Sequence, residues 1–145
     1  MAGWWTIVRI AHVLGACIWV GSLVAFTFFV RPGAQRTLGP ADSEELINRS
    51  GRQIGFFIAA ILVPLQLFSG MALLLHRGFT VVGSSSSLYR TIILTKIVIF
   101  FVVIAISAAH GVASARSAKN ASRILAYLAL GGSLALTAMG AALVS

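Results

Sequence analysis

Four long runs of apolar residues, separated by shorter polar stretches, dominate the pattern of this 145-residue chain. A membrane-spanning helix needs about 20 mostly apolar residues to cross about 30 Å of hydrocarbon. Four segments meet this requirement: Trp5–Val30, Ile54–Leu75, Tyr89–Ala113 and Ile124–Val144. Because no strand-like alternation of apolar and polar residues occurs, the pattern predicts an all-α membrane protein, a single four-transmembrane-helix bundle spanning residues 1–145.

The polar stretches between these runs predict three loops. The first, RPGAQRTLGPADSEELINRSGRQ, contains all three acidic residues of the chain. Within it, Pro40 and the Ala-Asp-Ser-Glu-Glu-Leu-Ile that follows predict a short capped helix lying at the cytoplasmic membrane surface. The second loop, RGFTVVGSSSSL, is flexible by composition.

Composition and charge support a membrane protein and exclude a nucleic-acid partner. Hydrophobic residues make up 59% of the chain, against about 45–50% in ordinary soluble domains. The net charge of +8 comes from bases at the ends of the predicted helices, which is typical of topology signals. The bases that flank the first and third loops are Arg31, Arg36, Arg49, Arg52, Arg116, Lys119 and Arg123. Only Arg9, Arg77 and Arg90 lie near the other side, so we expect a multi-pass protein of the plasma (inner) membrane with both termini and residues 77–88 outside.

The single cysteine, Cys17, excludes an internal disulfide, and the absence of a CxxC motif excludes covalent c-type haem and thiolate zinc sites. The N-terminus has no basic leader and no evident cleavage site, so we expect it to be a retained first helix. The fourth helix has small residues at intervals of four, which allow close helix packing in lipid. These are Ala129, Ser133, Thr137 and Ala141, and they pack either within the bundle or against a second protomer or larger membrane complex.

Ionisable residues at membrane depth are costly and are therefore candidates for function. His12 and Lys96 each lie five residues outward of a helix midpoint, which predicts that they share one height, roughly 7–8 Å above the membrane midplane. His110 would lie roughly 20 Å from His12 along the bundle axis, and His76 lies near the outer end of the second helix.

Polar stripes on three helices predict a pocket in the outer half of the bundle. On the first helix the stripe is His12, Gly15, Trp19 and Ser22, with Arg9 one turn above; on the second, Pro64, Gln66, Ser69 and Gly70; on the third, Lys96, Val103, Ser107 and His110. Each ionisable residue also has an interpretation that involves no function, and both kinds of interpretation stay open. His12 is a cofactor ligand, a proton relay or a neutral imidazole bonded to a neighbouring helix; Lys96 snorkels to the headgroups; His76 is interfacial and His110 structural.

Three stretches of the chain resemble known membrane families. HVLGACIWVGSLVAFTFFVRP, GRQIGFFIAAILVPLQLFSGMALLL and LYRTIILTKIVIFFVVIAISAAHG resemble the first three helices of the CopD-like (copper resistance protein D) proteins. The same helices are similar to the HemJ-type protoporphyrinogen oxidases, whose third helix also carries a Lys and then a His-Gly. The chain has VAFTFFVRPG where the HemJ-type motif has Leu-Pro-Arg and a second His, so the resemblance leaves open whether it is an oxidoreductase.

The HemJ-type resemblance implies a b-type haem protein with a redox role, in electron transfer or in the oxidation of a tetrapyrrole or quinol. It implies His12 as an axial metal ligand, with His76 as the best alternative second ligand. Arg9 and Lys96 would pair with propionates or complete the coordination. Porphyrin edges would rest on Trp19, Phe26 and Phe100, with Gly15 and Gly21 making room, and His110 is a further candidate cofactor-binding residue.

The CopD-like resemblance implies a different function, the passage of copper or another metal. Its stepping ligands would be His12, Cys17, Gln66 and Met71, with His110 as a cytoplasmic exit site, and a dimer is then expected because four helices are few for a transporter. A third interpretation is a non-catalytic accessory subunit that packs against a larger membrane complex through the fourth helix.

Overall fold

The protein is all-helical, as its hydrophobic pattern predicts. The computed structural model describes residues 2–81, 87–116 and 119–142, and within these ranges it contains helices and turns but no strand. Four of its helical segments are long and apolar enough to cross a membrane. The predicted fold class, an all-α membrane protein with four candidate spans, is therefore confirmed.

The chain divides into two compact units, Met1–Gly78 and Phe79–Ser145, and each unit is described by itself. The first unit contains two of the candidate spans and the second unit contains the other two. The prediction that all four helices form one domain stays a prediction.

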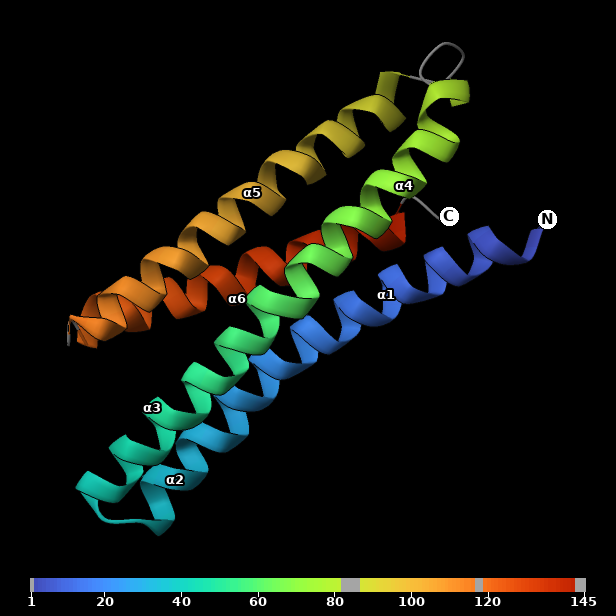
Figure 1. The fold of residues 1–145 in the computed structure, drawn as a ribbon. Coiled ribbons are helices and arrows are strands. Elements are labelled where there is room, and N and C mark those ends of the chain that lie inside the picture. Colours follow the sequence, from blue (N-terminus) through green and yellow to red (C-terminus); the bar gives the residue numbers. More distant parts are fainter. Residues whose placement is uncertain (1, 82–86, 117–118, 143–145) are drawn as a thin grey trace. The chain divides into compact units, whose positions relative to one another are not determined.

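The first unit consists of two long antiparallel helical rods (Figure 1). The first rod comprises α1 (Ala2–Ala25), η1 (Phe26–Val30) and α2 (Arg31–Thr37). The second rod comprises α3 (Pro40–Phe57), η2 (Ile58–Leu62) and α4 (Val63–Val81). The rods are joined by a two-residue turn at Leu38–Gly39, where both residues have extended backbone dihedrals.

The structure corrects the predicted first loop. Instead of a loop with a short surface helix, residues 31–53 continue both membrane helices as far as the turn. The polar residues of this segment end the apolar run, but they do not end the helix. Ala, Arg, Gln and Glu are good helix formers, so the helix continues through them. Pro40 lies at the first position of α3, where its missing N–H costs nothing, and the Ser43 amide donates the first helical hydrogen bond to the Gly39 carbonyl.

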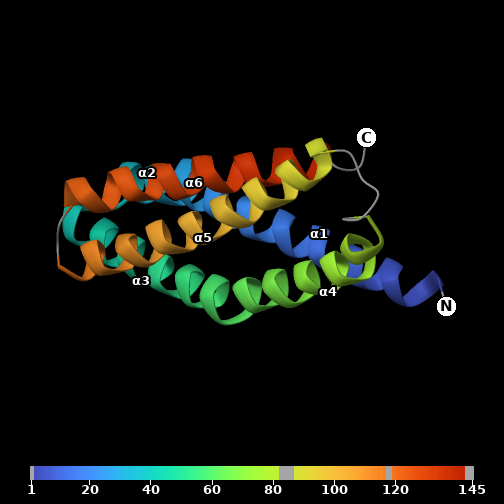
Figure 2. The ribbon, with the colours of Figure 1, turned by 90° about the horizontal axis from the view of Figure 1, so that it is seen from above.

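Each rod contains one π-helical segment, and each π segment precedes a proline by the same distance. In η1 the Arg31 amide bonds the Phe26 carbonyl and Pro32 follows, while in η2 the Val63 amide bonds the Ile58 carbonyl and Pro64 follows. A proline removes one donor and its ring clashes with the carbonyl four residues before it, and a π turn widens the helix at that carbonyl. The second rod bends where η2 meets α4 (Figure 2), as expected for a proline beside a π segment.

The second unit is an antiparallel pair, α5 (Ser87–Ala115) and α6 (Lys119–Ala142). Val103 is its most buried side chain, only 1% exposed, and it fills the space left by Gly132 on α6. The predicted polar face of α5 therefore faces α6. Two members of the small-residue stripe of α6, Ala129 and Ser133, are buried within this single chain, whereas Thr137 is exposed.

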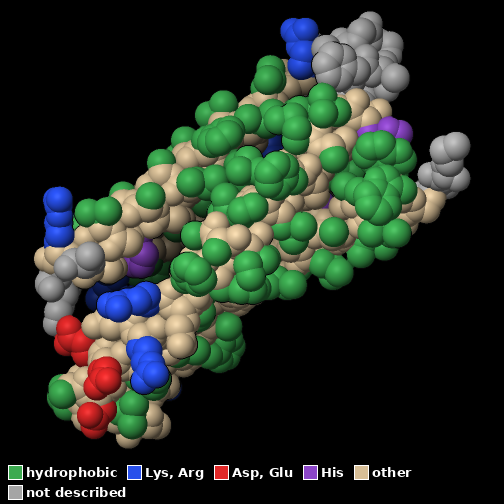
Figure 3. All heavy atoms as spheres, viewed as in Figure 1, with side chains coloured by type: hydrophobic (Ala, Val, Ile, Leu, Met, Phe, Trp, Pro, Cys, Tyr) green, Lys and Arg blue, Asp and Glu red, His purple; other side chains and the backbone are tan. Residues whose placement is uncertain are grey.

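Most of the apolar surface faces outward. Between 6% and 22% of the residues in the most apolar window of each candidate span are buried, and green apolar side chains cover much of the face seen in Figure 3. Soluble monomers rarely expose apolar patches larger than a few hundred Å². A bilayer supplies the apolar surroundings that these side chains need, so the chain is a multi-pass membrane protein.

Candidate functional site in the α1–α4 pair

A layered seam between α1 and α4 holds the polar residues of the first unit. The Trp5 ring lies on the His76 ring, His12 contacts Ser69, and Gly15 contacts Gln66. Moving from Trp5 to His12 advances seven residues on α1, and moving from His76 to Ser69 retreats seven on α4. This is the heptad spacing of two antiparallel helices that keep one face in contact.

The hydrogen bonds around His12 fix which of its ring nitrogens carries the proton. His12 Nδ1 lies 2.8 Å from Ser69 Oγ, and the Ser69 hydroxyl donates its only proton to the Leu65 carbonyl. Ser69 Oγ therefore accepts from His12, and Nδ1–H is the donor. In a neutral ring this leaves the lone pair on Nε2, the nitrogen that then serves as acceptor or ligand.

Two glycines bring the helices close enough for this contact. A Cβ added at Gly70 of α4 would lie 3.2 Å from His12 Cε1, so the imidazole edge rests on bare backbone. A Cβ added at Gly15 of α1 would lie 2.5 Å from Gln66 Nε2, closer than real Cβ contacts come. Each helix thus gives up a side chain where the other inserts one.

Gln66 completes the layer. Its Nε2 donates a hydrogen bond of 2.8 Å to the backbone carbonyl of His12, and both Gln66 and Ser69 are buried. Within the described residues, every buried side-chain nitrogen and oxygen has a hydrogen-bond partner. The layer is therefore a satisfied polar network inside an apolar pair of helices, and such networks favour one specific packing.

The remaining candidates of the first unit lie around this layer. Trp19 is buried two turns after His12 on α1, and Ile58 and Leu62 of the second rod are buried as well. Arg9 is exposed one turn before His12. His76 is stacked on Trp5, with ring centroids 3.6 Å apart and an interplanar angle of 8°, in a layer about 10 Å from the His12 layer along the helices.

The residues considered for copper passage are placed differently. Cys17 and Met71 are both exposed at the surface of the first unit, whereas Gln66 is buried and bonded to His12. Across the described ranges, no group of three or more His, Cys, Asp or Glu residues lies close enough together to hold a metal ion.

Lys96 belongs to the second unit and reaches the last turn of α6. Its Nζ would lie 3.2 Å from a Cβ added at Gly140, so this glycine makes room for the ammonium group. The expected pairing of Lys96 with His12 joins the two units and stays a prediction.

His110 also contacts α6. Its Nδ1 lies 2.8 Å from the Ser122 carbonyl, which can only accept, so Nδ1–H is again the donor. The Ser122 hydroxyl is 3.2 Å from the same nitrogen and 2.7 Å from the Ser114 hydroxyl. These contacts join the two helices near their connection.

Sequence reasoning did not anticipate several of these partners. It grouped Gln66 and Ser69 with the polar pocket, but it did not connect Ser69 to His12, Trp5 to His76, or His110 to Ser122. Stripe analysis shows which residues share one face of a helix, whereas these pairs depend on the register between helices. The matching seven-residue spacings of Trp5 to His12 and of Ser69 to His76 are the one signal in the sequence for this register.

No known family model, curated protein or solved structure matches the chain. The resemblance to CopD-like and HemJ-type proteins therefore stays a prediction from the quoted sequence stretches.

Proposed function

We propose that the protein is a membrane-embedded b-type haem protein with a redox role, and that His12 is an axial ligand. The observation that supports the proposal most directly is the hydrogen bond between His12 Nδ1 and Ser69 Oγ. Ligating histidines commonly donate their other ring N–H to an oxygen acceptor, which fixes the ring and raises its basicity. Ser69 would do this for His12, with Nε2 as the ligating atom.

The residues around His12 fit a site in which this histidine would supply one ligand to a haem iron. His12 supplies an oriented imidazole, and exposed Arg9 lies one turn outward, where it would pair with a propionate. The Gln66 amide lies against Gly15, and the role of this glycine beside a porphyrin stays a prediction. When bound, haem supplies reversible one-electron chemistry. Lys96 and His110 of the second unit keep their proposed roles as propionate partner and further cofactor contact.

The position of His76 gives less support to the expectation that it supplies a second ligand. The His76 ring stacks on Trp5, about two helical turns outward of His12. To hold one iron together, both imidazoles would have to reach the same atom, and the two histidines lie about 10 Å apart along their helices. We therefore propose His12 as the one histidine ligand of the first unit.

The test is the visible spectrum of the purified full chain, oxidised and then reduced with dithionite. We expect a Soret band that is lost in His12→Ala and kept in His76→Ala and His110→Ala. Ser69→Ala should keep the band but raise the reduction potential, because a less basic imidazole stabilises the oxidised iron less, or weaken haem retention, by about 10-fold or more in affinity. A colourless protein from haem-replete cells contradicts the proposal, as does a His12→Ala variant with the wild-type spectrum.

We also propose the orientation and surroundings that the charge pattern favours. Four spans would put both termini on one side of the membrane, and the seven bases against three support the outside of the plasma membrane as that side. A redox partner in the membrane, or a second copy of the chain that contacts the exposed part of α6 near Thr137, is consistent with this placement.

A further inference from the structure

A polar surface on α3 lies at a depth where the neighbouring rod is apolar. Both rods start from the turn at Leu38–Gly39. The first rod has seven residues, 31–37, before its apolar run begins at Val30, whereas the second has fourteen, 40–53, before its apolar run begins at Ile54. At 1.5 Å per residue, the polar segment of α3 is about 10 Å longer than that of α2.

A direct contact fixes this offset. The ring of Phe26 in η1 packs on Gly51 of α3, where an added Cβ would lie 3.2 Å from the ring. Residues 48–53 of α3 therefore run alongside η1, whose Phe29 is 72% exposed. One turn further along the second rod, Phe56 is 74% exposed. Large aromatic side chains with this exposure contact lipid, so the polar segment lies at the edge of the hydrocarbon layer.

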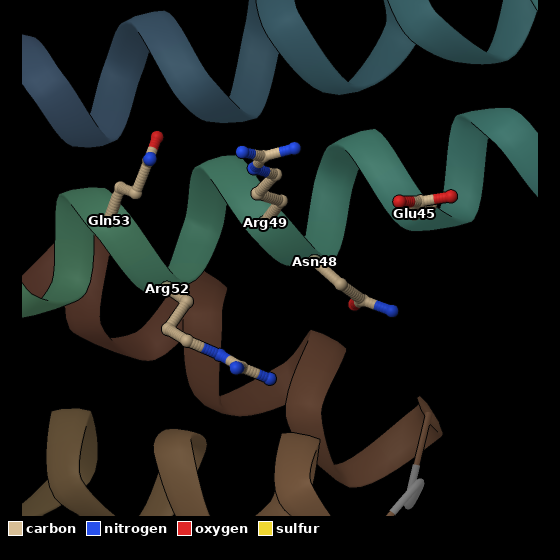
Figure 4. A pocket seen from close by; sticks show the side chains of 5 residues that line it. All are labelled: Glu45, Asn48, Arg49, Arg52 and Gln53. Carbon is tan, nitrogen blue, oxygen red and sulfur yellow. The ribbon is translucent and has the colours of Figure 1, made fainter.

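Five exposed polar side chains lie close together along this segment of α3. We name these residues the α3 polar patch: Glu45, Asn48, Arg49, Arg52 and Gln53. Figure 4 shows Arg49 and Gln53 pointing to one side of the helix and Asn48 and Arg52 to the other. Each side thus combines a guanidinium with an amide, four residues apart on one helical face.

The charge along α3 is sorted by distance from the membrane. Its acidic residues, Asp42, Glu44 and Glu45, lie towards the turn, and its two arginines lie towards the apolar span. Figure 3 shows the same order over α3, with red side chains at the turn end and blue ones next to the apolar surface. The cationic end of the patch is therefore the end that reaches the lipid headgroups.

We propose that the α3 polar patch binds the headgroup of an anionic phospholipid. The phosphate oxygens would accept hydrogen bonds from Arg52 and Asn48, with Arg49 and Gln53 on the adjacent side, and the acyl chains would lie on the exposed phenylalanines. Guanidinium groups bind phosphate with paired, charge-assisted hydrogen bonds. Basic pockets beside membrane helices are typical sites for anionic headgroups.

The experiment is native mass spectrometry of the full chain in mixed micelles with phosphatidylglycerol or, as the neutral reference, phosphatidylcholine. We expect phosphatidylglycerol to bind in preference, and Arg52→Gln to lower its apparent affinity about fivefold, since an arginine at a charged membrane surface is worth about 1 kcal/mol. Arg52→Lys should retain part of the binding, because it keeps the charge and loses the paired hydrogen bonds.

The matched control is Arg36→Gln, which removes the same charge at the far end of α2, outside the patch. Wild-type binding in this control, together with a loss in Arg52→Gln, supports the site. Equal binding of the two lipids, or an equal loss in both Gln variants, overturns it. Displacement of the lipid by millimolar inorganic phosphate overturns it too, because the patch would then be a site for free phosphate. Circular dichroism of each variant checks that its helices are intact.

Discussion

At the scale of single residues, the structure is governed by close approaches that only glycine permits. Gly15, Gly70 and Gly132 each face a side chain from the neighbouring helix at a distance that a Cβ would not allow or would barely allow. In lipid the hydrophobic effect does not press helices together, so packing and hydrogen bonds must hold them. The bare backbone at these positions makes both possible.

Gly132→Ala should destabilise the second unit by about 1–3 kcal/mol, because the new methyl group would lie 2.5 Å from a Val103 methyl carbon. The adjacent Gly131 has open space around it, so Gly131→Ala should be neutral or stabilise the helix by up to about 1 kcal/mol. The free energy of unfolding, measured by titration with sodium dodecyl sulfate, compares the two. Equal effects would show that α5 and α6 do not pack at Val103.

Ser69→Ala should change the protonation pattern of His12 in the protein without haem. With Ser69 present, we expect Nδ1 of the imidazole to carry a proton, because the serine proton is given to Leu65 and the serine oxygen therefore accepts from the ring. Removing the acceptor costs about 1 kcal/mol of stability and frees the ring to take the other tautomer. Nitrogen-15 spectra of histidine-labelled protein report the tautomer, with the His110 signals as internal control. An Nε2–H tautomer in the wild type would contradict the assignment.

At the scale of helices, hydropathy predicted the spans well and the helix ends poorly. As far as the structure describes them, the four apolar runs lie within helical segments, but α2 and most of α3 extend through residues that the pattern assigned to a loop. Hydropathy reports where lipid begins, whereas a helix ends where its backbone geometry changes, here at Leu38 and Gly39. Both π segments were also missed, although each stands at a fixed distance from a proline.

A π segment amounts to one extra residue in an α-helix, which predicts where a deletion is tolerated. Deleting Ala60 from η2, together with Pro64→Ala, should restore an α-helix and leave Ser69 facing His12, within about 1 kcal/mol of Pro64→Ala alone. Deleting Ala72 instead of Ala60, again together with Pro64→Ala, should turn His76 by about 100° away from Trp5. We expect a further loss of about 1 kcal/mol from the broken stack.

The measurement is again the free energy of unfolding in detergent, with Pro64→Ala as the reference protein. If both deletions are equally harmful, the π segment is not the extra residue that its hydrogen bonds indicate.

At the scale of the whole molecule, the distribution of charge and the even number of candidate spans limit how the chain can lie in the membrane. If all four candidate spans cross the membrane, the turn at Leu38–Gly39 and the α5–α6 connection would share one side. The sequence alone is enough to state this expectation, because it needs only a count of spans and the positions of the bases. It was not sufficient for the contacts of the candidate site, since His12 meets Ser69 through a register that no single helix encodes.

Cysteine labelling tests the orientation. In a Cys17→Ser background, Thr37→Cys and Asn120→Cys, both at exposed positions, should react with a membrane-impermeant maleimide only in inverted vesicles. Gly3→Cys, also exposed, should react only in right-side-out vesicles or intact cells. Labelling of Thr37→Cys and Asn120→Cys from opposite sides would contradict four spans, and labelling of all three with sides exchanged would contradict the orientation.

The continuity of the two rods through the turn at Leu38–Gly39 has a practical consequence for imaging. A chain of 15.3 kDa that is mostly embedded in a micelle offers little mass for particle alignment in electron cryo-microscopy. Because α2 and α3 run without a break into the apolar segments, a soluble helical domain grafted between Thr37 and Pro40 would be joined to the first unit by two stiff connections. The hairpin is thus the natural insertion point for a fiducial marker.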